Sequence, residues 1–201
     1  MTTWTSKHLT ALCFVGALGA CDVVDSGNTL LAGLAPPADT ALPAVPLKQA
    51  LMMRGKVTLV PPGGYCIDPE SLSQSFALMA RCDALGAATG GSGAPVGVMT
   101  VSFARVGNDV QLPTAQEFAA AAGLADPENT HRYATGVIFR TSGTPLAGDL
   151  SPRHWRAISK VGAFSMGAAL FGPEGRRAVS EEGAEVLQEM IQRTTDKTNP
   201  G

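Results

Sequence analysis

The feature that most constrains this chain is an apolar run close to its N-terminus. Residues 9–18 read LTALCFVGAL, with Thr10 as the polar break, and the segment before them carries one lysine, Lys7. A helix that crosses a bilayer needs about 20 residues, so this run is too short to be a transmembrane helix. Its basic start and apolar centre are the layout of a secretory signal. Residues 1–20 are therefore predicted to direct export and to be removed.

The end of this run resembles a known processing motif. Leu18-Gly19-Ala20-Cys21 is similar to the lipobox of bacterial lipoproteins, in which an aliphatic residue and two small residues precede the cysteine that becomes the first residue. The resemblance covers residues 1–21. It implies a lipoprotein signal peptide cut by signal peptidase II and acyl chains such as palmitate on Cys21, which together hold a protein on a membrane stably. The alternative is an ordinary secretory signal, with Cys21 as a nearby thiol.

The resemblance also implies a location. A lipidated Cys21 would hold the chain on the periplasmic face of the cell membrane, with the membrane itself as the partner of the anchor. Asp22 follows the cysteine directly and is similar to the residue that retains lipoproteins in the inner membrane of enteric bacteria. This favours the inner membrane and leaves the outer membrane open.

The remaining cysteines predict a disulfide bond. Cys13 is removed with the signal and the lipobox cysteine carries lipid, which leaves Cys66 and Cys82. In an oxidising compartment two such cysteines are expected to pair, and a closed loop of about 15 residues stabilises a fold by about 3 kcal/mol in the chain-entropy model. A redox role lacks the Cys-x-x-Cys spacing. For a zinc site only His131 and His154 remain, and their spacing argues for no metal ligand set.

Composition limits the classes of partner. The 201 residues are 45% hydrophobic and 16% charged, with a formal net charge of −2, which suits one globular domain. Because acidic residues slightly outnumber basic ones, the sequence indicates no basic face that could bind nucleic acid. The basic residues stand singly apart from Arg176-Arg177, so the sequence also supports no electrostatic binding to anionic lipids.

The chain divides into three parts. Residues 1–20 are the signal, residues 21–50 form a tether rich in proline and alanine, and residues 51–198 form a single globular domain. Strand patterns cover 54–60, 65–67, 96–103 and 133–141, and 154–171 forms one long strand or a hairpin. Helix patterns cover 113–122 and 180–195. For 76–82 a strand is favoured over a helix that would continue to 85.

These elements predict an α+β fold. We expect a mainly antiparallel sheet of about six or seven strands with two or more helices, the C-terminal one packed on the sheet. The order is loosely similar to the Mog1/PsbP-type sandwich. The body resembles uncharacterised bacterial envelope lipoproteins in the stretches Gly64–Asp68, Arg81–Leu85 and His154–Ala157, a resemblance that implies no activity.

One triplet is a candidate surface for a ligand or a partner. His154, Trp155 and Arg156 place an aromatic ring between two cationic side chains, an arrangement that can stack a sugar or a peptide. The alternation of a strand favours a second reading, in which Trp155 is a core residue and its neighbours point the other way. No catalytic residue is predicted, because the stretch around Ser165 has Ala163 in place of the first glycine of a nucleophile elbow.

The sequence therefore favours a non-catalytic function. We expect a lipid-anchored envelope protein that serves as a protein-interaction or envelope-assembly module, with an envelope protein as its partner and without a metal or other cofactor. The alternative is a periplasmic lipoprotein that binds a small ligand or a carbohydrate beside His154, Trp155 and Arg156.

Overall fold

The computed structural model of the protein describes residues 44–91, 93–107 and 110–199. The predicted signal and the positions of Cys21 and Asp22 lie outside these residues, as does most of the predicted tether. No helix in the described part of the chain is long and apolar enough to cross a membrane. The described residues belong to one compact unit, which we call the body.

A seven-stranded antiparallel sheet forms the centre of the body. In spatial order its strands are β3 (Tyr65–Ile67), β4 (Phe76–Arg81), β5 (Val98–Arg105), β9 (Phe164–Phe171), β8 (Arg153–Val161), β7 (Gly136–Ser142) and β6 (Glu128–Tyr133). A separate hairpin pairs β1 (Ala50–Met52) with β2 (Val57–Leu59). The expected α+β fold with a mainly antiparallel sheet is confirmed.

Two strands were not expected from the sequence. β6 has exposed residues along almost its whole length, so its sequence shows no alternation of apolar and polar positions. β1 contains three residues, too few for a periodic pattern. The strand expected over 133–141 also starts later, because Tyr133 ends β6 and a turn precedes β7 at Gly136. By contrast, 76–82 contains β4, the favoured reading, and 154–171 forms the β8–β9 hairpin.

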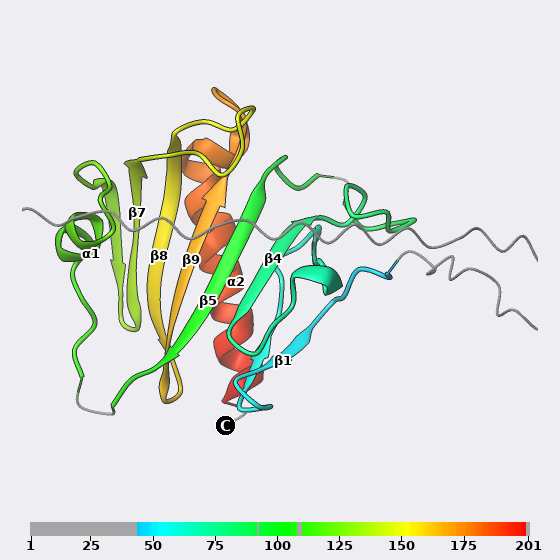
Figure 1. Cartoon of the computed structure of the whole chain (residues 1–201), viewed down its shortest axis with the longest axis horizontal. Helices are drawn as coiled ribbons and strands as arrows, with labels where there is room; N and C mark the ends of the chain where they lie inside the picture. The colour runs from blue at the N-terminus through cyan, green and yellow to red at the C-terminus, as the bar shows by residue number, and fades with distance from the viewer. Residues whose placement is uncertain (1–43, 92, 108–109, 200–201) are drawn as a thin grey trace, which may run out of the picture. The chain divides into compact units, whose positions relative to one another are not determined.

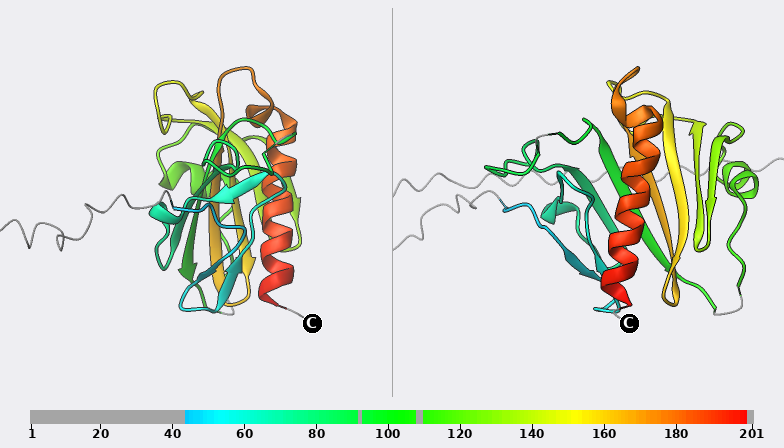
Figure 2. Two further views of the ribbon diagram at one scale, coloured as in Figure 1. Left: turned by 90° about the vertical axis from the view of Figure 1, so that its right-hand side faces the viewer. Right: turned by 180° about the vertical axis from the view of Figure 1, so that it is seen from behind.

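The long helix α2 (Glu181–Thr198) packs on one face of the sheet, against β7, β8 and β9 (Figure 2). Its buried residues recur at helical spacing: Gly183, Ala184, Leu187, Met190, Ile191 and Thr194. The helix also holds the β1–β2 hairpin, because the hydroxyls of Thr194 and Thr198 accept hydrogen bonds of 3.1 Å each from the backbone N–H groups of Val60 and Thr58. The predicted C-terminal helix on the sheet is confirmed.

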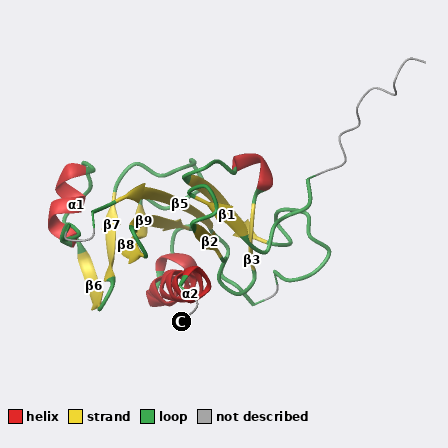
Figure 3. Cartoon of the chain, turned by 90° about the horizontal axis from the view of Figure 1, so that it is seen from below, coloured by secondary structure: helices red, strands yellow, loops and turns green. Residues whose placement is uncertain are grey.

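A second, short helix lies on the opposite face. Helix α1 (Ala115–Ala121) packs against β7 at one side of the sheet, and a capping box of Thr114 and Glu117 begins it. Figure 3 shows α1 and α2 on opposite sides of the strands. Two 3₁₀ turns complete the body, η2 (Pro69–Ser71) and η3 (Arg177–Val179). The face opposite α2 is thus covered by a helix at one side only, and we call its part over β4, β5, β9 and β8 the open face.

The predicted disulfide is present in the body. Cys66 on β3 and Cys82, which directly follows β4, are bonded to each other and fully buried. Between them, Asp68 caps the short turn η2 by accepting a hydrogen bond of 3.0 Å from the Glu70 N–H. The bond therefore joins the two outermost strands on this side of the sheet.

Candidate functional site

The structure divides the His154–Arg156 triplet between the two faces of the sheet. Trp155 points towards α2 and is fully buried, and its indole Nε1 donates a hydrogen bond of 2.7 Å to the Ser180 carbonyl. His154 and Arg156 lie on the opposite face, as strand alternation requires. The core reading of Trp155 is confirmed. The expectation of a stacking surface is wrong for the indole, because the core encloses it.

Trp155 fits so closely because the helix above it has a glycine at the point of contact. A Cβ atom built on Gly183 would lie 2.5 Å from Trp155 Cδ1, which is closer than two carbon atoms can approach. On its other sides the indole lies 5.7 Å from the ring of His131 and 5.5 Å from the guanidinium carbon of Arg140. These contacts are structural and leave the indole no room for a ligand.

His154 is a buried, neutral histidine on the open-face side. Burial lowers its pKa to about 4, so the ring carries no charge at neutral pH. Its Nδ1 lies 2.8 Å from the Pro152 carbonyl, and Arg156 Nε donates to its Nε2 at 2.9 Å. Because Nε2 accepts, the proton of the neutral ring is on Nδ1 and bonds to Pro152. The ring also stacks on Phe171 at 4.4 Å.

Arg156 is a half-buried cation without an acidic partner. Its guanidinium lies over the Phe171 ring at 5.5 Å and is oriented by His154, and burial lowers its pKa. Within the described residues no carboxylate lies at ion-pair distance from it. Other arginines of the body do have such carboxylates: Arg81, Arg140, Arg153, Arg177 and Arg193. The terminal nitrogens of Arg156 therefore remain available to an anion.

Beside Arg156 the open face carries a row of small residues between large ones. The strand registers place one row across the sheet in the order Phe76, Ser102, Gly167, Ile158 and Val137. The next row runs Leu78, Thr100, Ala169, Arg156 and Phe139. Residues two apart on a strand lie about 7 Å from each other, so the backbone of Arg156 lies beside Ile158 of the first row, while its guanidinium is directed the other way, to His154 and Phe171.

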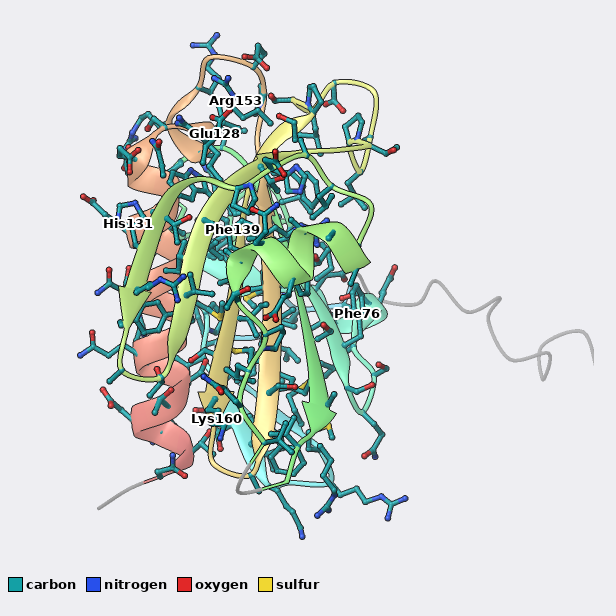
Figure 4. The ribbon with its side chains drawn as sticks, turned by 90° about the vertical axis from the view of Figure 1, so that its left-hand side faces the viewer. Phe76, Glu128, His131, Phe139, Arg153 and Lys160 are labelled. Carbon is teal, nitrogen blue, oxygen red and sulfur yellow. A yellow bond between two sulfur atoms is a disulfide. The ribbon has the colours of Figure 1, made fainter. Side chains whose placement is uncertain are left out.

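This row forms the floor of an apolar groove. The groove has a volume of about 410 Å³, with Ser102, Gly167 and Ile158 on its floor and Phe118 of α1 on one wall. Phe76, which is 38% exposed, lies on the far side of Ser102. Figure 1 presents the open face to the viewer, with α1 at its left. In the edge-on view of Figure 4, Phe76 and α2 lie on opposite sides of the sheet.

The described residues offer no cluster of metal ligands, and Ser165 is held within the sheet. No cluster of three or more His, Cys, Asp or Glu in the described part is placed to bind a metal ion. Ser165 lies within β9, where its hydroxyl donates to the Ala104 carbonyl at 3.4 Å. The groove and Arg156, which lie on the same face of the sheet, are therefore the candidate site.

Sequence reasoning identified Arg156 and His154 but not the groove. Its floor comes from β5, β9 and β8, which only the sheet register brings together. Serine and glycine in strands carry no signal of a binding surface, and the lack of a carboxylate beside Arg156 is a property of the folded chain. No local pattern could have found either feature.

Comparison with known proteins adds no further information. No protein-family model matches the chain, and no curated protein or solved structure is significantly similar to it. The function is therefore argued from the residues and their geometry.

Proposed function

We propose that this chain is a lipid-anchored envelope protein whose body binds a partner protein without catalysis. The bound part of the partner is an apolar segment that lies in the groove of the open face and carries a carboxylate, which reaches across the neighbouring row of residues to Arg156. The observation that carries this proposal is the half-buried guanidinium of Arg156, which lies on the same face as the groove, one row of residues from its floor, and has no carboxylate beside it in the described part of the chain.

The chemistry of Arg156 favours a carboxylate. A buried charge without a counter-charge is costly, and a guanidinium fork matches the two oxygens of a carboxylate. Arg156 Nε is already bonded to His154, so the terminal nitrogens are held in a fixed direction. A fixed donor loses less conformational entropy on binding than a free side chain.

The groove favours an apolar, close-fitting segment. Ser102 has a small side chain and Gly167 has none, so a backbone laid over them can approach the sheet closely, while Phe76 and Ile158 offer apolar surface on either side. Burying apolar surface supplies about 25 cal/mol per Å². The apolar surface alone would bind many apolar segments. The guanidinium adds specificity, because it favours a segment with a carboxylate at a defined position.

The carboxylate preference is tested with a short acetylated peptide of alternating leucine and alanine, as the free acid and as the C-terminal amide. We expect the free acid to bind the body more tightly by about tenfold or more, because a hydrogen bond to a charged group contributes about 1.5–3 kcal/mol. The variant Arg156→Gln should bind both forms alike. Isothermal titration calorimetry measures the affinities.

The matched control is Arg153→Gln on the same strand. Arg153 pairs with Glu128 at 4.0 Å and lies outside the groove, so this variant should keep the preference for the free acid. Circular dichroism checks that both variants are folded. If the unaltered protein bound the free acid and the amide with equal affinity, the proposed role of Arg156 would be contradicted. If it bound neither peptide, the groove would be contradicted as a binding site.

The anchor is tested separately by the intact mass of protein extracted from membranes. The lipobox resemblance supports a mass that begins at Cys21 and includes acyl chains, and the disulfide adds a rise of about two hydrogen masses on reduction. The variant Cys21→Ser should lose the acyl mass and leave the membrane fraction. A mass without lipid would contradict the anchor while leaving the groove proposal in place.

A further inference from the structure

Basic residues that are far apart in the sequence meet at one end of the body. The β1–β2 turn, the end of β5, the β8–β9 turn and the last turn of α2 form this end, which lies at the bottom of Figure 1. Four exposed cations stand on these segments: Arg54, Lys56, Arg105 and Lys197. We call these four residues the basic end.

Contacts between the segments show that the four residues belong to one surface. Arg54 and Arg105 line the same hollow of about 550 Å³, and the Arg105 guanidinium lies 5.6 Å over the Phe164 ring. The Thr58 N–H donates to the Thr198 hydroxyl at 3.1 Å, which places the segments that carry Lys56 and Lys197 side by side. The fold thus gathers cations that the sequence scatters.

The charges of the basic end are not neutralised within the described part of the chain. The ion pairs found there use other arginines and His131. Asp196 is the acidic residue that the described part contributes to this end. Asp109 lies outside the described residues. Even if its charge is included with that of Asp196, the four cations of the basic end outnumber the two acidic residues. At the opposite end, by contrast, α2 begins with Glu181 and Glu182.

We propose that the basic end rests on a bilayer surface rich in anionic phospholipid headgroups. The proposal rests on the proposed function, because lipid on Cys21 would keep the body within reach of such a surface. Residues 22–43 span at most about 75 Å when fully extended, whereas the nine residues of β8 cover about 30 Å. The chain between the anchor and the body is therefore long enough to bring the basic end to the membrane.

The test measures binding of the chain from residue 21 onward, carrying Cys21→Ser, to sedimented vesicles. Because this variant cannot be lipidated on residue 21, its affinity is that of the protein surface alone. We expect binding to phosphatidylglycerol vesicles, little binding to phosphatidylcholine vesicles, and weakening at high salt. A basic residue at an anionic surface strengthens binding by about fivefold, so Arg54→Gln with Lys56→Gln should weaken it by about 25-fold.

The matched control removes the same charge from the opposite end. Arg153→Gln with Arg176→Gln should leave vesicle binding unchanged, and circular dichroism checks the fold of both double variants. Equal weakening by the two pairs would overturn the proposal, since net charge alone would then account for binding. Failure to bind phosphatidylglycerol, or stronger binding to soluble heparin than to the vesicles, would also overturn it. None of these results depends on lipidation. The proposals on the anchor and on the basic end are therefore tested independently of each other.

Discussion

Replacement of Trp155 by alanine is expected to lower the free energy of unfolding by about 3–5 kcal/mol, the usual loss when a large buried aromatic side chain is truncated. The indole is fully enclosed between β8 and α2 and donates its hydrogen bond to the Ser180 carbonyl. Its loss leaves both a cavity and a buried carbonyl without its donor. Urea denaturation followed by far-ultraviolet circular dichroism measures the change. A natural domain is stable by about 5–15 kcal/mol, so this variant approaches the limit of folding.

A conservative replacement keeps this prediction testable if the alanine variant fails to fold. Trp155→Phe retains a buried aromatic ring and should cost less, about 1–3 kcal/mol, mainly through the unpaired Ser180 carbonyl. Leu51, which is 70% exposed, provides the control, and Leu51→Ala should leave stability almost unchanged. A loss at Trp155 no larger than the loss at Leu51 would show that the indole does not support the packing of α2.

Removal of the disulfide is expected to cost about 3 kcal/mol in the chain-entropy model. Cys66 and Cys82 join β3 to the end of β4 at the outer side of the sheet. The double variant Cys66→Ala with Cys82→Ala should therefore unfold at lower urea concentration than the oxidised protein. Because both sulfurs are fully buried, reduction of the folded protein should be slow without denaturant.

A reductant supplies the control for this prediction. Dithiothreitol, added once the protein has been partly unfolded, should lower the urea midpoint of the unaltered protein towards that of the double variant. It should leave the midpoint of the double variant where it was. If the midpoints of the oxidised and double-variant proteins coincide, the bond adds nothing measurable to stability, and the entropy argument does not hold for this loop.

Much of the architecture could be predicted, because regular helices and strands leave a periodic pattern of apolar residues within a short stretch of sequence. The spacing of Val186, Leu187, Met190 and Ile191 predicted α2; the last three are buried and Val186 is partly buried. Strand alternation likewise predicted that Trp155 and Arg156 point in opposite directions. β6 was missed because it is a polar edge strand, in which exposure removes the apolar half of the alternation.

The candidate site could be predicted only in part. Arg156 stood out as a cation beside an aromatic residue, but the aromatic ring it contacts is Phe171 on the neighbouring strand rather than Trp155. Which ring lies beneath a cation depends on strand register, and register follows from the pairing of distant segments. The same holds for the basic end, whose residues occupy three separate segments of the chain.

The position of α2 in the chain also sets when this protein can become folded. The helix follows all the strands of the described part, yet it covers the core face of β7, β8 and β9 and holds the β1–β2 hairpin, which comes first among them. A chain that emerges N-terminus first therefore keeps its apolar sheet face uncovered until residues 181–198 have been made and released. The body can therefore complete its core only after α2 has been released.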